Sequence, residues 1–332
     1  MKKNRIYGTI GPACCEAEVL KKMFSEGMDG IRLNLSHTTL DEAAGMIEVY
    51  REAARELGIT PELLIDMQGP ELRIGALKQP IRLNTDDVIG TDSIPFPKEV
   101  IGALKGSAIG QELLLDDGKI LLKAEKPGLL RVIRGGLLES KKSVALPGCD
   151  IRTPAMTETD REQIKKAKPY GVTGLMQPFV RSKDDLIEVR NALLKAGCGD
   201  IRLFAKIENM AGVESLDELI PYCDEIVIAR GDLGNAMELW ELPAVQKRIA
   251  EACRKAGRDF MVVTQMLDSM IARPVPTRAE VSDIFNAVLD GASSVMVTGE
   301  TATGKYPVDA IRYLAKTARE AESYISSHWP RR

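Results

Sequence analysis

The chain has 332 residues, a length that suits one large domain or a barrel that carries an insertion. Its 45 basic and 48 acidic residues nearly balance, so no charge excess favours nucleic acid or a membrane surface as a partner. Only two histidines are present, which excludes a zinc site built on several imidazoles, and no apolar run predicts a signal peptide or membrane span. We expect a cytoplasmic protein whose chemistry uses Lys, Arg, Asp, Glu and hydroxyl groups.

Short apolar runs alternate with segments of helical periodicity along the chain. Strands are expected to begin near residues 6, 30, 63, 172, 203, 226, 260 and 295. Helices are expected at 16–26, 40–57, 158–168, 183–196, 214–221, 242–256, 278–290 and 307–323. Thr157, Ser182 and Thr277 are suitable N-caps for three of them. Eight such units predict an α/β fold, a closed (β/α)8 TIM barrel.

The interval between the third and fourth predicted strands is much longer than the others. Residues 75–145 contain short strand-like runs broken by Gly, Pro and Asp, which predicts a small β domain inserted after strand 3. We divide the chain into barrel strands 1–3 (1–74), an inserted β lid domain (75–148) and barrel strands 4–8 (149–332). An insertion after a strand leaves from the active-site face, so we expect a lid; an insertion remote from the chemistry is the alternative.

Polar side chains follow the second and third predicted strands. Strand alternation places Arg32, Asn34 and Ser36 on one side of the second strand, and the third strand ends at Asp66. The oxygen atoms of Asn34, Ser36 and Asp66 form either a cation site or a hydrogen-bonded strand end.

Two more carboxylates follow the fifth and sixth strands. Lys206 and Glu208 are two residues apart and share one side of the fifth strand, and Asp232 follows the sixth. Glu208 and Asp232 form an incomplete oxygen shell that suits Mg2+, whereas a structural Lys206–Glu208 ion pair is the alternative. Thr264 after the seventh strand adds a hydroxyl that either joins this site or caps the strand.

Two other sequence patterns are not assigned a catalytic role. Residues 299–305 have the spacing of a P-loop, but Tyr306 stands where that motif needs Ser or Thr, so we expect the eighth barrel loop. The six cysteines include no C-x-x-C pair, and we expect free thiols.

Long motifs, in order along nearly the whole chain, resemble the pyruvate kinase family. They are TIGPA (9–13), IRLNLSH (31–37), DMQGPELR (66–73), LLLDDG (113–118), KKSVALPG (141–148), AKIEN (205–209), ARGDLG (229–234), TQMLDSM (264–270), PTRAEVSDIFNAVLDGA (276–292) and GETATGKYP (299–307). The resemblance implies phosphoryl transfer from phosphoenolpyruvate to ADP, which gives pyruvate and ATP.

The resemblance also implies roles for the matching residues at the reaction centre. Glu208 and Asp232 would bind Mg2+ (or Mn2+), and Gly231, Asp232 and Thr264 would lie near the substrate carboxylate. Lys206 and Arg32 would hold the transferring phosphoryl group. Thr264 would organise the water that protonates the enolate.

A K+ site and a nucleotide site are implied in the same way. The K+ ligands would be Asn34, Ser36, Asp66 and the backbone carbonyl of Met67. The nucleotide would be held by Asn34, His37, Arg73 and Lys142. Family members that need K+ carry Glu at the position of Glu71, so we expect K+ dependence.

The sequence also departs from the family pattern. Gln68 and Thr303 each replace a usual Lys, Gln177-Pro178 replaces Ala-Ser, residues 235–238 replace Val-Glu-Ile-Pro, and the lid is shorter. The alternatives are therefore a Mg2+-dependent lyase or aldolase-like paralogue that acts on an oxo acid, and a non-catalytic sensor of phosphoenolpyruvate or nucleotide. Because the sequence ends soon after the last barrel helix, we expect no allosteric control through the family's carboxyl-terminal domain, and a homodimer formed through the barrel.

Overall fold

The computed structural model describes residues 3–116, 118–149, 151 and 153–328. The chain forms two compact units. The first comprises Met1–Gly69, Ala155–Arg230 and Pro243–Arg332, and the second comprises Pro70–Pro154 and Gly231–Leu242. The domain limits predicted above stay a prediction, and no sequence pattern assigned residues 231–242 to the inserted unit.

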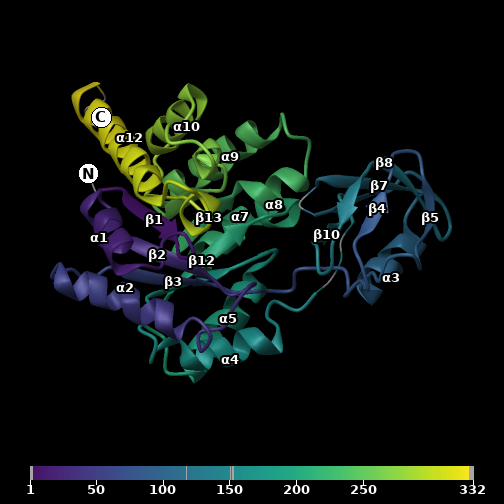
Figure 1. Cartoon of the computed structure of the whole chain (residues 1–332), viewed down its shortest axis with the longest axis horizontal. Helices are drawn as coiled ribbons and strands as arrows, with labels where there is room; N and C mark the ends of the chain where they lie inside the picture. Colours follow the sequence, from purple (N-terminus) through teal and green to yellow (C-terminus); the bar gives the residue numbers. More distant parts are fainter. Residues whose placement is uncertain (1–2, 117, 150, 152, 329–332) are drawn as a thin grey trace. The chain divides into compact units, whose positions relative to one another are not determined.

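Eight parallel strands close into a barrel in the first unit, in the order β1-β15-β14-β13-β12-β11-β3-β2 (Figure 1). The strands are β1 (Arg5–Thr9), β2 (Gly30–Asn34), β3 (Glu62–Asp66), β11 (Gly174–Gln177), β12 (Arg202–Ile207), β13 (Glu225–Ala229), β14 (Asp259–Val263) and β15 (Ser294–Met296). Each begins within two residues of its predicted start. The predicted TIM barrel is confirmed.

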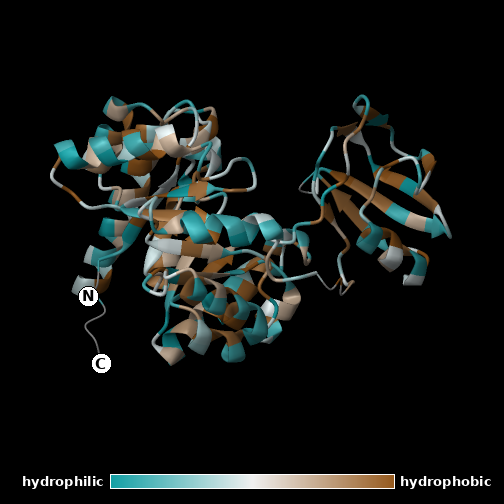
Figure 2. Ribbon diagram, turned by 90° about the horizontal axis from the view of Figure 1, so that it is seen from below, coloured by the Kyte–Doolittle hydropathy of each residue, from teal (hydrophilic) through white to brown (hydrophobic). Residues whose placement is uncertain are grey.

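The longer helices follow the strands and cover the barrel. They are α1 (Ala17–Ser25), α2 (Ala44–Glu56), α4 (Glu158–Ala167), α5 (Lys183–Lys195), α9 (Leu242–Ala256), α10 (Arg278–Leu289) and α12 (Pro307–His328). In Figure 2 the barrel strands are mostly brown, whereas the helices combine teal with brown, as expected when one helix face packs on the strands. The expected N-caps Thr157, Ser182 and Thr277 are confirmed, and each is part of a capping box. In the part of the chain that the structure describes, no helix is both long and apolar enough to cross a membrane.

Shorter helical turns follow the carboxyl ends of the later strands. They are α6 (Met210–Glu214), α7 (Leu216–Leu219), η1 (Ile220–Tyr222), α8 (Arg230–Asn235), η2 (Asp268–Ile271) and α11 (Gly299–Ala302). The single helix predicted at 214–221 is wrong, because α6 ends at Glu214 and Ser215 starts a separate turn. The P-loop-like stretch forms α11, as expected of the eighth loop.

Apolar side chains fill the barrel lumen. Its buried cluster consists of Tyr7, Leu64, Met176, Phe204, Val227, Ala229, Met261, Val263 and Met296. Asp66 lies two residues beyond Leu64, and Lys206 lies two beyond Phe204. Because side chains alternate along a strand, both point into the same lumen, one layer nearer to the carboxyl ends.

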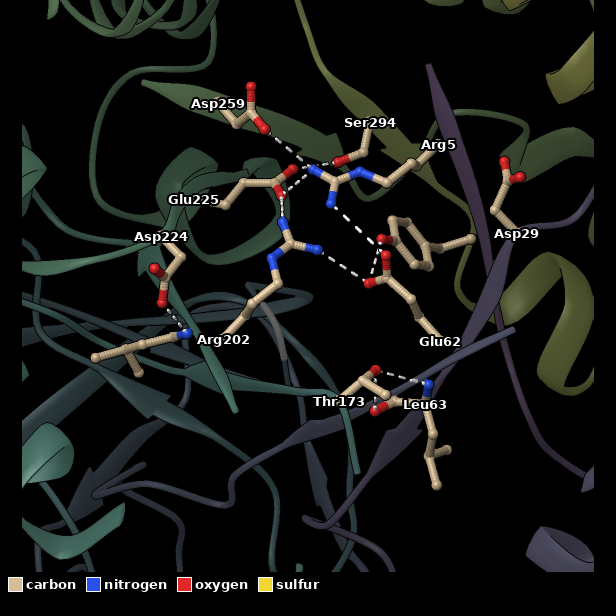
Figure 3. Close-up of polar contacts among 12 residues, drawn as sticks. Arg5, Asp29, Glu62, Leu63, Thr173, Arg202, Asp224, Glu225, Asp259 and Ser294 are labelled. Atoms are coloured by element: carbon tan, nitrogen blue, oxygen red, sulfur yellow. Dashed lines mark hydrogen bonds and ion pairs between the residues drawn. The ribbon is translucent and has the colours of Figure 1, made fainter. Parts of the chain in front are cut away.

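Charged side chains close the amino end of the barrel, where Figure 3 shows them. Arg5, Glu62, Arg202, Glu225, Asp259 and Ser294 are each the first residue of their strand. Arg5 and Arg202 both donate to Glu225 Oε2, at 2.6 Å. Burial raises the pKa of the Glu225 carboxyl, although the two guanidinium groups oppose this shift.

The inserted unit has its own apolar core and two antiparallel sheets. One sheet has the order β10 (Val144–Ala145), β6 (Glu112–Leu115), β7 (Ile120–Lys126), β8 (Leu129–Arg134) and β5 (Val88–Gly90); the other pairs β4 (Ile81–Leu83) with β9 (Gly136–Leu138). Helix α3 (Lys98–Gly106) was not predicted. Leu113, Leu115, Leu122 and Val132 are fully buried in this core. The strand-like runs in 75–145 therefore form a small β structure, as the sequence predicts.

Candidate active site

Four charged side chains meet at the carboxyl ends of β2, β3 and β12. Asp66, the last residue of β3, accepts from Arg32 Nη2 at 2.6 Å and from Lys206 Nζ at 3.1 Å. Lys206 Nζ also lies 2.9 Å from Glu208 Oε1. Asp66 and Glu208 are almost fully buried. The ion pair considered as the alternative for Lys206 and Glu208 is present, and it belongs to a larger network.

Asp66 is the anion that holds the two cations of this network together. Burial opposes its ionisation, but the Lys206 ammonium and the Arg32 guanidinium outweigh burial and hold the pKa of the Asp66 carboxyl below its usual range. An ionised Asp66 fixes both cations at the rim of the lumen, side by side. Two fixed cations suit the equatorial oxygens of a transferring phosphoryl group.

The Glu208 carboxylate is oriented by the backbone after β11. Glu208 Oε2 accepts from the Phe179 N–H at 2.8 Å, and Phe179 has a φ of 53°, in the left-handed region that bulky residues rarely adopt. A buried, oriented carboxylate of this kind fits a hard divalent cation.

Asp232 and Gly231, the other residues predicted near this cation and the substrate, lie in α8. Asp232 is in the first turn of the helix and follows the end of β13 by three residues. Among the described residues, no group of three or more His, Cys, Asp and Glu side chains could enclose a metal. Glu208 belongs to the first unit and Asp232 to the second, and Mg2+ binding by these two carboxylates stays a prediction.

The predicted K+ ligands lie around the end of β2 and β3. Asn34 Oδ1 accepts from the Ser36 N–H at 3.1 Å, so a hydrogen-bonded strand end is present. The Met67 N–H donates to Met176 O at 3.1 Å, which ties the residue after β3 to β11. Neither contact uses the Met67 carbonyl, and the K+ site stays a prediction.

Thr264 directly follows β14 in an unusual backbone conformation. Thr264 and Gln265 have φ values of 77° and 56°, and each such non-glycine residue costs about 1–3 kcal/mol. The cost is highest for a β-branched residue such as Thr. Backbone strain of this size persists only where surrounding contacts impose it, and it concentrates at functional sites.

The residues predicted to hold the nucleotide divide between the two units. His37 follows β2 in the first unit, and its N–H donates to Asn34 O at 3.4 Å. Arg73, in the inserted unit, pairs with Glu71 at 2.7 Å. Lys142 Nζ lies 3.0 Å from Asp116 Oδ1, and this hydrogen-bonded carboxylate raises the pKa of Lys142. Nucleotide binding by these residues stays a prediction.

All six cysteines are free thiols, as expected. Cys14, after β1, is fully buried, and burial raises the pKa of its thiol to about 11. A thiol with that pKa is unreactive near neutral pH.

Three residues that support the site were not identified from the sequence. Phe179 orients Glu208 through its backbone, Arg230 contacts the Thr264 carbonyl, and Asp160 accepts from the Gln68 N–H. Only Arg230 carries a sequence signal, because it belongs to the ARGDLG motif next to Gly231.

Comparisons with known proteins match this chain to one family. The family model "Pyruvate kinase, barrel domain" matches residues 1–311. The pyruvate kinase of Bacillus licheniformis is 36% identical over 342 residues, which cover 98% of this chain and 58% of that protein. The pyruvate kinase of Methylorubrum extorquens is 38% identical over 336 residues (97% and 69%), and that of Aeropyrum pernix is 35% identical over 334 residues (99% and 73%).

The alignments cover nearly all of this chain but only part of each relative. The chain spans less than two thirds of the length of the Bacillus relative. The matched part contains the barrel, the inserted unit and every predicted site residue. The chain belongs to the pyruvate kinase family.

Proposed function

We propose that this protein transfers the phosphoryl group of phosphoenolpyruvate to ADP and releases pyruvate and ATP. The observation that carries the proposal is the Arg32–Asp66–Lys206–Glu208 network at the carboxyl end of the barrel. Two cations fixed by one buried carboxylate, beside a second carboxylate suited to a divalent cation, are what phosphoryl transfer needs.

Each residue has a distinct task in this reaction. Lys206 and Arg32 bind the phosphoryl oxygens while the bond from phosphorus to the enol oxygen breaks and the bond to a β-phosphate oxygen of ADP forms. Their charge stabilises the transition state more than the substrate, because negative charge spreads over the equatorial oxygens during transfer. The enolate left behind takes one proton at its methylene carbon, and Thr264 orients the water that delivers this proton.

Metal ions and the nucleotide complete the proposed site. Glu208 and Asp232 would hold Mg2+, which neutralises charge on the substrate oxygens when bound. Asn34, Ser36, Asp66 and the Met67 carbonyl would hold K+. Asn34, His37, Arg73 and Lys142 would contact the nucleotide. We further propose a cytoplasmic homodimer and a lid function for the inserted unit.

The test is a direct assay of pyruvate formation from phosphoenolpyruvate with Mg2+ and K+, with ADP included or omitted. ADP-dependent formation of pyruvate and ATP in equal amounts is expected. Consumption of an oxo acid without ADP would replace the proposal with a lyase or aldolase-like activity. Tight binding of phosphoenolpyruvate without any turnover would replace it with a sensor.

A further inference from the structure

The guanidinium of Arg230 holds the strained turn that carries Thr264. Arg230 Nε and Nη2 both donate to the Thr264 carbonyl, at 3.1 and 2.9 Å, and Nη2 also reaches Gln265 O at 3.3 Å and Met266 Sδ at 2.9 Å. These are the contacts of one side chain with three consecutive residues. Two of those residues have positive φ values.

The other edge of the same guanidinium is anchored to the helical layer. Arg230 Nη1 lies 2.7 Å from Asp283 Oδ2 on α10 and 3.5 Å from Gln246 Oε1 on α9. The Arg230 side chain is only 10% exposed. A planar guanidinium with five fixed donors bridges a carboxylate and two carbonyls at once, which the single ammonium of Lys cannot do.

The rest of the loop has separate supports. Glu300 Oε1 accepts from the Leu267 N–H at 3.0 Å, and Glu280 Oε1 accepts from the Ser269 N–H at 2.7 Å. The Thr264 hydroxyl makes no hydrogen bond to another residue in the described part of the chain, so a water or substrate can use it. Arg230 therefore controls the first residues of the loop, where the strain lies, and leaves the hydroxyl accessible.

We propose that Arg230, anchored by Asp283, is a positioning residue that keeps Thr264 in its strained conformation and so aims the Thr264 hydroxyl for proton delivery. The role in proton delivery rests on the proposed function. The clamp, meaning the contacts of Arg230 with residues 264–266 and with Asp283, does not depend on that function. Substrate and phosphoryl contacts through Arg32 and Lys206 are independent of this clamp. Because Thr264 would also lie near the substrate carboxylate, loss of Arg230 should slow proton transfer by a larger factor than it raises the KM for phosphoenolpyruvate.

Hydrogen exchange tests the clamp without any assay of activity. In Arg230→Met, the amides of residues 264–266 should exchange at least about tenfold faster, while residues 268–271 keep their protection. Arg190→Met is the matched control, because Arg190 also bridges a carboxylate (Asp224) and a backbone carbonyl (Ile201) but lies at the amino end of the barrel. Unchanged exchange at 264–266 in Arg230→Met would overturn the proposal.

Proton exchange at the methyl carbon of pyruvate in D2O tests the positioning. The enzyme removes a proton from C3 of pyruvate, which forms the enolate and reverses the final protonation step. It then adds a deuteron to the enolate, which repeats that step in the forward direction. Arg230→Met should slow this exchange at least about tenfold, with KM for phosphoenolpyruvate within about threefold of wild type. Arg190→Met should exchange at the wild-type rate.

A double-mutant cycle separates positioning from general damage. If Arg230 acts through Thr264, adding Thr264→Val to Arg230→Met should slow proton exchange by less than about threefold further. If the two substitutions slow proton exchange by independent factors that multiply, the proposal is overturned. Full activity in Arg230→Lys would also overturn it, because Lys keeps the positive charge but lacks the planar guanidinium with its several donors. A wild-type protein without turnover would refute the proposed function and the proton-delivery role, whereas faster amide exchange at 264–266 would still support the clamp.

Discussion

Lys206 is the residue whose charge the proposed chemistry uses most directly. Its ammonium touches both Asp66 and Glu208, and it faces the lumen one layer above Phe204. We expect Lys206→Met to lower kcat about 100- to 1,000-fold, because the lost charge acts mainly in the transition state. Steady-state kinetics and circular dichroism would measure the loss of turnover and the retained fold.

Lys247→Met is the matched control for this change. Lys247 also forms an ion pair, with Asp290 Oδ1 at 2.6 Å, but it lies on α9 with an exposed side chain. Its kcat should equal that of the wild type. A Lys206→Met variant with wild-type kcat would refute the role of Lys206.

Asp66 should make stability depend on pH. Its pKa is lower in the folded protein, so its ionisation stabilises the fold above the unfolded pKa of about 4 and loses this effect as the pH falls through the folded pKa. Asp66→Asn should cost about 3–5 kcal/mol at pH 7, because Arg32 loses its carboxylate partner and Lys206 loses one of its two. Urea unfolding of both proteins should show this difference shrinking below about pH 4; a difference that stays constant with pH would contradict the pKa shift.

At the scale of secondary-structure elements, Asp160 connects helix α4 to the turn that follows β3. Its carboxylate completes the capping box of α4 and also accepts from the Gln68 and Gly69 N–H groups, at 3.0 and 3.2 Å. Asp160→Ala should therefore cost about 3 kcal/mol of unfolding free energy, since it removes a helix cap and leaves buried donors unpaired. Chemical denaturation measures this cost.

Asp185 provides the comparison for Asp160. It completes the capping box of α5, accepts from the Arg181 N–H and pairs with the Arg181 guanidinium at 3.2 Å, and none of these contacts reaches the turn after β3. Asp185→Ala should cost about 1–2 kcal/mol, for a helix cap and one partly exposed ion pair. Equal costs for the two variants would show that Asp160 acts only as a cap.

The elements themselves were largely predictable from sequence. Alternation of apolar runs and helical periodicity located all eight barrel strands, because these signals are local. Long-range contacts determine the helix boundaries and the unit membership that the sequence did not predict. Ser215 starts a new turn within the helix predicted at 214–221, and residues 231–242 join the inserted unit through tertiary contacts that no periodicity records.

The same contrast holds for the site. Arg32, Asp66, Lys206 and Glu208 were predicted because polar residues at the ends of parallel strands converge on one edge. The strained backbone at Thr264 was not predictable, since Thr disfavours a positive φ and the contacts with Arg230 that accompany this conformation are long-range. Conformations that oppose local preference are set by tertiary structure.

At the scale of the whole barrel, the two ends have different tasks. The amino end carries the ion-pair network of Figure 3, and the carboxyl end carries the proposed chemistry. Arg202 bonds Glu62 and Glu225, at 3.0 and 2.6 Å, so Arg202→Met should lower unfolding free energy by about 3 kcal/mol. Its kcat and KM, measured at a temperature where it is folded, should match the wild type; a loss of kcat would contradict this separation.

The central claim is tested most directly by measuring pyruvate formation from phosphoenolpyruvate and ADP with Mg2+, in K+ buffer and in Na+ buffer. Glu71 and the oxygens of Asn34, Ser36 and Asp66 predict turnover that depends on K+. Equal rates in the two buffers would contradict the K+ site. Absence of turnover in both would contradict the proposed phosphoryl transfer.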